Sequence, residues 1–229
     1  MTDHSKRSIH PRPQLVIDGS GSLLFAGILD HDLNWLGQQT VEGAALENLF
    51  ATVENALQAA NVELSDLGTF IYNAGPGSVL GLRLTAMALQ TWAQLNPAAI
   101  QFKAYNTLQL AMRLLRIDQP DLQDALIVSD WKKGAWNALY LTEAGIGTTE
   151  VVDDAQIEAY PHPTFHLPQR KGWQSPPANA KTISLLPVRL PEVYHEPNFL
   201  KSTQGVELYT SAINTFQKWT PERHRAKGP

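Results

Sequence analysis

The string Gly75-Pro76-Gly77-Ser78-Val79-Leu80-Gly81-Leu82-Arg83 decides the fold, because it joins a predicted strand to a predicted helix. The apolar run from Thr69 to Asn73 has the length of a buried strand, and apolar residues repeat with a helical period from Val79 to Leu95. Glycine at such a turn permits positive φ, and Ser78 can cap the helix. The turn could hold an anion, or it could only let two buried elements touch at Gly81.

Upstream of this turn the sequence predicts a β-meander and then a helix. A buried strand from Gln14 to Asp18 enters the turn Gly19-Ser20-Gly21-Ser22, and its partner strand runs from Leu23 to Leu29. A third strand is expected at Asn34 to Gln39. From Glu42 to Ala60 the apolar period changes to about 3.6 residues, which predicts an amphipathic helix lying on the sheet.

Downstream, the helix from Val79 to Leu95 is apolar on two faces, so we expect it to be buried on two sides. A strand at Ala98 to Lys103 and a helix at Asn106 to Arg116 follow it. The next segment repeats the first hairpin, because a buried strand from Leu126 to Asp130 enters a polar turn and a second strand, Ala135 to Leu141. Such self-similarity predicts a duplicated α/β architecture.

Beyond residue 148 the pattern is weaker. Val151 to Tyr160 predicts a strand end with a short helix, Thr182 to Leu186 a last strand, and Glu207 to Trp219 a helix. The Pro-rich residues 161–179 are interpreted as loop. His162 and His166 have the spacing of a helical metal-binding pair, but the prolines around them argue against a helix, so no metal site is predicted.

Composition limits the classes of function. The chain has 229 residues, no cysteine and 43% hydrophobic residues, which favours a globular protein of a reducing cytoplasm without disulfides. No run approaches the length of a membrane span. The net charge of −4 combines basic ends, at residues 1–13 and 218–229, with an acidic body. An acidic body is a poor surface for phosphates, so we expect no direct nucleic-acid binding by it.

The glycine-rich string resembles the GPGSFTGLR signature of the TsaB and TsaD family, and it stands in the same place after a strand and before a helix. Val16-Ile17-Asp18-Gly19-Ser20 is similar to the family's opening IDTS strand. Asp130-Trp131-Lys132 stands where TsaB proteins have DAR. The order and spacing agree over about residues 14–141, and the length of the chain suits TsaB better than the longer TsaD.

The resemblance implies an α/β, actin-like ATPase (ASKHA, ribonuclease H-like) fold of two duplicated subdomains, each with a mixed five-stranded sheet and helices. It implies an N-terminal subdomain at 14–105, which carries the dimerisation face, and a C-terminal subdomain at 106–219. The basic ends at 1–13 and 220–229 are expected to be disordered tails.

In this family TsaD carries the catalytic metal site on an H-x-x-x-H helix, and TsaB holds TsaD through helices of its first subdomain. Glu42 to Ala60 contains no histidine, so the resemblance implies a non-catalytic partner subunit for tRNA N6-threonylcarbamoyladenosine synthesis. The expected partners are a TsaD-like protein, with TsaE as a further one, or a second copy of the chain. The expected interface consists of Leu46, Leu49, Phe50, Val53, Leu80, Leu84 and Trp92.

Departures from the family pattern mark a divergent member, since Val41-Glu42-Gly43-Ala44 replaces the HS/TE segment. Two hairpins clasp ATP and Mg²⁺ in actin-like ATPases, so the resemblance points to Asp18, Gly19, Ser20, Gly21, Ser22 and Asp130 as nucleotide-binding candidates. The bulky Trp131 disfavours the second half of that clasp. One alternative function is an enzyme of the same fold, a small-molecule kinase or carbamoyl transferase, in which Asp18 orients Mg²⁺. Another is a homodimeric remnant of the family with a different partner.

Overall fold

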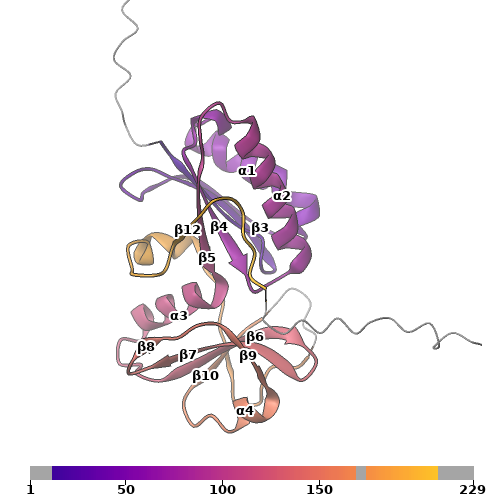
Figure 1. Ribbon diagram of the computed structural model, residues 1–229, viewed down its shortest axis with the longest axis vertical. Helices are drawn as coiled ribbons and strands as arrows, with labels where there is room; N and C mark the ends of the chain where they lie inside the picture. The colour runs from indigo at the N-terminus through magenta and orange to yellow at the C-terminus, as the bar shows by residue number, and fades with distance from the viewer. Residues whose placement is uncertain (1–11, 169–173, 211–229) are drawn as a thin grey trace, which may run out of the picture.

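The computed structural model describes residues 12–168 and 174–210. Two β-sheets form two lobes, with a helix between them (Figure 1). Within the described residues no helix is long and apolar enough to cross a bilayer.

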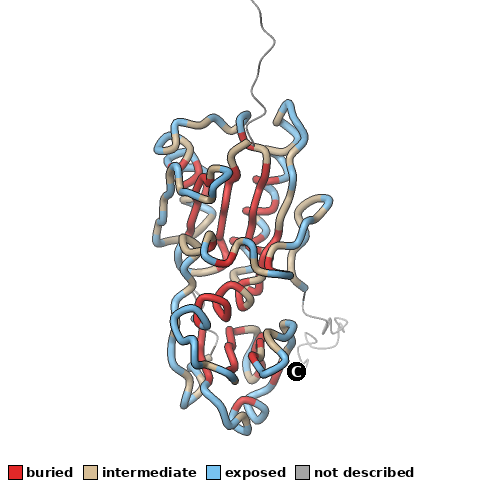
Figure 2. The backbone as a smooth tube through the Cα atoms, turned by 90° about the vertical axis from the view of Figure 1, so that its left-hand side faces the viewer, coloured by how far each residue is buried: buried red, intermediate tan, exposed pale blue. Residues whose placement is uncertain are grey.

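The first sheet has six strands in the order β12-β5-β4-β1-β2-β3. Strands β1, β4 and β5 are parallel, while β2, β3 and β12 pair antiparallel. The strand bounds are β1 Gln14–Asp18, β2 Leu23–Leu29, β3 Trp35–Glu42, β4 Thr69–Gly75, β5 Gln101–Asn106 and β12 Lys201–Thr203. The central strands are buried on both faces, as their continuous apolar sequence predicts (Figure 2).

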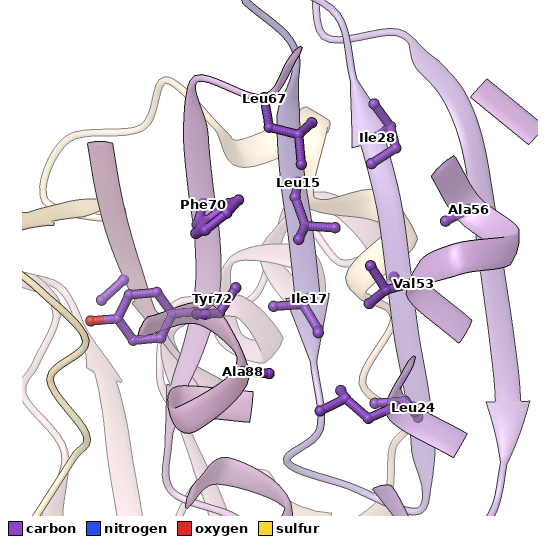
Figure 3. Packing of buried hydrophobic residues seen from close by; sticks show 14 residues of the cluster. Leu15, Ile17, Leu24, Ile28, Val53, Ala56, Leu67, Phe70, Tyr72 and Ala88 are labelled. Carbon is purple, nitrogen blue, oxygen red and sulfur yellow. The ribbon is translucent and has the colours of Figure 1, made fainter. Parts of the chain in front are cut away.

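Helices α1 (Ala45–Ala60) and α2 (Val79–Leu95) cover one face of this sheet, and a short 3₁₀ turn, η1 (Leu64–Asp66), follows α1. Their inward side chains join those of the strands in one apolar core, which Figure 3 shows around Leu15, Phe70 and Val53. Helix α2 is buried on one side only, through Leu82, Ala86 and Leu89 among others. The expectation that it is buried on two sides is therefore wrong, because no further layer of the described chain covers it.

Helix α3 (Thr107–Asp118) lies between the two sheets, and the 3₁₀ helix η2 (Pro187–Val193) packs beside it on the first sheet. Leu110 and Leu114 of α3 contact the first sheet, whereas Leu108, Ala111 and Met112 contact the second. The helix begins where the Asn106 side chain accepts the N–H groups of Leu108 and Gln109. Since α3 contributes to two cores, it fixes the two lobes against each other.

The second sheet also has six strands, in the order β11-β10-β6-β7-β8 with β9 paired to β7. As in the first sheet, a hairpin (β6–β7) is followed by a strand that pairs parallel to its first strand. This agreement confirms the predicted duplication. The elements are β6 Ala125–Lys132, β7 Ala135–Thr142, β8 Gly145–Ile146, β9 Glu150–Asp153, α4 Asp154–Glu158, β10 Thr164–Leu167 and β11 Lys181–Thr182.

The structure corrects several expectations. Each sheet has six strands rather than five, and β12 returns from the expected C-terminal subdomain (106–219) to pair with β5 of the first. Part of the expected loop at 161–179 is strand β10, and the strand expected at Thr182 to Leu186 is β11, which ends at Thr182 and is followed by β12. Strands of two to four residues are too short to show a period, and their pairing is set by the edges that they meet.

The two chain ends also differ from expectation where they are described. Arg12 of the expected tail donates to the backbone carbonyls of Ser65 and Asp66, and it lies 3.3 Å from the side-chain oxygen of Asn96. Of the two basic tails, residues 1–11 and 220–229 lie outside the described residues. Of the helix expected at Glu207 to Trp219, residues 207–210 are not helical, and the rest lies outside the described residues.

Candidate functional site

The predicted acid of the first hairpin, Asp18, is the centre of a buried hydrogen-bond network. It is 1% exposed. Its Oδ1 accepts the backbone N–H of Ser20 at 2.8 Å and the Ser20 hydroxyl at 2.7 Å. Its Oδ2 accepts Nδ2 of Asn73 at 2.8 Å and the hydroxyl of Tyr105 at 2.6 Å. Four donors use the four acceptor positions of a carboxylate. Asp18 therefore ties the hairpin turn to the ends of β4 and β5.

Tyr105 contributes to this network as a neutral donor. Burial raises the pKa of Tyr105 well above its ordinary value, and the negative charge of Asp18 raises it further. The phenol therefore stays protonated and keeps its hydrogen bond to the carboxylate across the neutral pH range. Sequence reasoning missed both Tyr105 and Asn73 as partners of Asp18, because each stands at the end of a different strand and only the parallel pairing brings them together.

The signature turn packs directly on the first hairpin turn. The peptide bond between Gly75 and Pro76 is cis, and Gly75 has a φ of 107°, as a glycine turn was expected to allow. The backbone N–H of Ser78 donates to the Ser20 carbonyl at 2.7 Å, and the Ser78 hydroxyl accepts from Gly81 N–H as the predicted helix cap. A Cβ on Gly77 would lie 2.5 Å from the Ser20 carbonyl oxygen. Of the two readings, this contact favours close packing over anion binding.

The second predicted acid, Asp130, faces away from the first. It lies opposite Trp136, whose side chain belongs to the core on the outer face of the second sheet. Its Oδ1 is 3.5 Å from Nε2 of His166, a β10 residue that is 4% exposed. Its neighbour Ser129 lines the cavity between the lobes instead, because successive residues of a strand point to opposite faces. Asp130 therefore does not line the cavity that Asp18 lines, as a clasp formed by both hairpins would require.

Three of the four remaining nucleotide candidates line that cavity. Its volume is about 90 Å³, and Ser20, Gly21 and Ser22 form one side of it. Across the cavity lie Ser129 and Leu167 of the second sheet and the segment from Ile183 to Pro187. Gly19 is buried and packs against Thr85 and Gly81 of α2.

These groups do not fit a clasp for Mg²⁺ and ATP. The acceptor positions of Asp18 are already used by protein donors. In the second hairpin, Gly134 donates its N–H to the side chain of Gln174 at 2.7 Å, so that donor is also taken. No lysine or arginine is found among the described residues that line the cavity. A phosphate chain would therefore lack both its metal-orienting acid and one of its turn donors.

A second candidate site is the outer surface of α1 and α2, which we call the helical face. It consists of the exposed apolar side chains of the two helices. Phe50 of α1 and Trp92 of α2 pack edge to face with ring centroids 6.0 Å apart, so the two helices contribute to one continuous surface. The exposed fractions are Leu46 62%, Phe50 58%, Val79 62%, Leu80 61%, Met87 65% and Leu95 74%.

The predicted interface residues divide into two groups. Leu46, Phe50 and Leu80 lie on the helical face, with Leu84 and Trp92 half-buried beside them. Leu49 and Val53 are 0% and 3% exposed and belong to the core, so their assignment to the interface is wrong. Sequence reasoning missed Met87 on this face, although the spacing of Leu80, Met87 and Leu95 marks one helical stripe. Arg83 of the signature is exposed on α2.

Part of the sequence matches a known protein family. A family described as TsaD, tRNA N6-adenosine threonylcarbamoyltransferase, matches residues 40–129, from the end of β3 into β6. No curated protein matches the sequence.

Two solved structures cover nearly the whole chain. YeaZ from Pseudomonas aeruginosa has 17% identity and a TM-score of 0.61, over 87% of this chain and 100% of its own. An uncharacterised protein with similarity to peptidase YEAZ from Pseudomonas aeruginosa also has 17% identity and a TM-score of 0.61, over 86% of this chain and 99% of its own. The chain thus shares the fold of YeaZ, and its residues 40–129 match the TsaD family in sequence.

Proposed function

We propose that this protein is a non-catalytic partner subunit in the synthesis of tRNA N6-threonylcarbamoyladenosine, and that it binds a TsaD-like protein through the helical face. The observation that carries the proposal is the set of six large apolar side chains that α1 and α2 expose, on two helices joined by the contact of Phe50 with Trp92. Contiguous exposed apolar surface of this kind marks interaction sites in soluble proteins. The YeaZ fold and the TsaD family match support the choice of pathway and partner.

The helical face has the anatomy of a protein interface. Its centre is apolar and contains the Phe50 and Trp92 aromatic pair, which is a favoured kind of anchor residue. Glu47 and Glu54 on α1 and Arg83 on α2 are exposed polar residues of the same two helices. A polar rim around an apolar centre provides register and specificity, while the centre provides most of the binding free energy.

A second copy of the chain is the other partner that the helical face suits. In a homodimer, α1 and α2 of one copy would pack on the same helices of the other and bury the same side chains. The alternative of an actin-like enzyme finds less support, because Asp18 is engaged in four hydrogen bonds and does not face Asp130.

The test is size-exclusion chromatography with light scattering, on the chain alone and mixed with the TsaD-like protein of the same organism. We expect a one-to-one heterodimer, and we expect Leu80→Asp to abolish it. Leu80 lies in the first turn of α2, where a carboxylate suits the helix dipole, so the fold should tolerate the change.

The matched control is Leu36→Asp. Leu36 is 41% exposed but lies on the edge strand β3. Its substitution should leave the heterodimer intact. A chain that stays monomeric with TsaD present, or a heterodimer that survives Leu80→Asp, would contradict the proposal. A homodimer that TsaD does not displace would assign the helical face to self-association.

A further inference from the structure

The cavity lies between the two lobes, where a ligand could contact both, but its lining residues do not suit the charged phosphates of a nucleotide. Its walls include the apolar side chains of Leu23, Leu167, Ile183 and Leu185. Asp18 is the only ionisable residue among the described residues that line it, and its acceptor positions are engaged by protein donors. A charged ligand would lose its hydration there without gaining a counter-ion.

One polar group in the cavity lacks a protein partner. Ser129 is 2% exposed and lines the cavity, and its hydroxyl makes no hydrogen bond within the described part of the chain. Buried hydroxyls are nearly always paired, so an unpaired one on a residue that lines a cavity is the group there that a bound molecule would satisfy. A hydroxyl can both donate and accept, which suits an amide or an alcohol equally.

The mouth of the cavity adds further hydrogen-bonding groups. The exposed Ser22 and Ser184 stand on opposite sides, one in the first hairpin turn and the other beyond β11. A molecule held among Ser22, Ser129 and Ser184 would contact both lobes at once.

We propose that this cavity binds a small uncharged molecule with an apolar body and an amide or hydroxyl head that hydrogen-bonds to Ser129. The ligand takes the place between the lobes where actin-like ATPases hold phosphates, but it is recognised by hydroxyl groups and apolar contact instead of by charge. Binding links the hairpin turn of the first lobe to the second sheet and so stabilises the folded chain. The proposal is independent of partner binding by the helical face.

The experiment uses three probes of one shape and different charge: isobutyramide, isobutyrate and isobutyramidinium. Dissociation constants are measured by ligand-observed NMR titration with the full chain, and inorganic phosphate is titrated as a fourth probe. We expect the neutral amide to bind most tightly and to raise the melting temperature. Ser129→Ala should weaken amide binding by about 2- to 10-fold, the usual effect of losing one neutral hydrogen bond.

A second variant keeps the test decisive even where Ser129→Ala perturbs the fold. Ser22→Trp places a large side chain at the exposed mouth of the cavity, and we expect it to abolish amide binding. Ser202→Trp, an equally exposed serine on β12 away from the cavity, is the matched control and should bind the amide normally. The proposal is overturned if no probe binds, if a charged probe or phosphate binds as tightly as the amide, or if Ser22→Trp leaves binding unchanged.

Discussion

The two methionines of the described chain provide a direct test of which helix surface binds a partner. Met87 of α2 is 65% exposed on the helical face, whereas Met112 of α3 is 0% exposed between the sheets. Substitution of each by alanine removes the same atoms. The two variants should therefore separate the free energy of partner binding from the free energy of unfolding.

The magnitudes follow from burial. Complete burial of a methionine side chain contributes about 1.5–3 kcal/mol. Met87 has 65% of its surface left to bury, so its loss should cost the complex about 1–2 kcal/mol. This corresponds to a dissociation constant raised about 5- to 30-fold. The unfolding free energy of the isolated chain should change by no more than about 0.5 kcal/mol.

Met112→Ala should do the reverse. A cavity in the core costs about 2–5 kcal/mol of stability, with a melting temperature lowered by about 2–4 °C for each kcal/mol. The affinity of the folded fraction for the partner should be unchanged. Calorimetric titration with the TsaD-like protein and thermal denaturation measure the two quantities. The reasoning is refuted if Met87→Ala destabilises the isolated chain as much as Met112→Ala, or if it leaves the affinity within twofold of the wild type.

Three further outcomes are expected. Gly77→Ala should lower the free energy of unfolding by about 1–3 kcal/mol, because the new Cβ would clash with the Ser20 carbonyl. Gly21→Ala is the control, since its Cβ would enter open space and should leave stability in chemical denaturation nearly unchanged. Because burial and the charge of Asp18 raise the pKa of Tyr105 in the folded state, its stabilising effect is complete below pH 10.0 and is lost as pH rises through the folded pKa. Thermal scans should therefore show a smaller alkaline loss of stability for Tyr105→Phe than for the wild type, and equal losses would contradict this. Mg²⁺ with ATP should give no heat of binding in calorimetry, and saturable binding would show that the network around Asp18 opens.

Much of the first lobe could be predicted from the sequence. The strands Gln14–Asp18 and Leu23–Leu29 and the helix Val79–Leu95 have the expected bounds, because apolar period and turn residues act locally. Strand β10 could not be predicted, since its four residues stand among prolines and it exists only through its pairing with β6.

The candidate sites were only partly accessible to sequence reasoning. The string from Gly75 to Arg83 correctly indicated a tight turn with Ser78 as helix cap, a local property of glycine and serine. The role of Asp18 depended on Asn73 and Tyr105, which are 55 and 87 residues away along the chain. The role of Asp130 depended on the orientation of its strand. Such contacts arise from sheet register, which no local pattern contains.

The sequence by itself determined the order of the strands and helices from Gln14 to Leu141, the glycine turn and the absence of histidine on α1, because these depend on residue type and local period. Only the tertiary structure decided which apolar stripe of α2 stays exposed, which strand residue faces the cavity and where β12 pairs. The physical reason is that the burial of a side chain depends on which segments pack against it. A stripe of leucine and methionine has the same period whether it meets a sheet, a partner or water, and only the packing of distant segments distinguishes them.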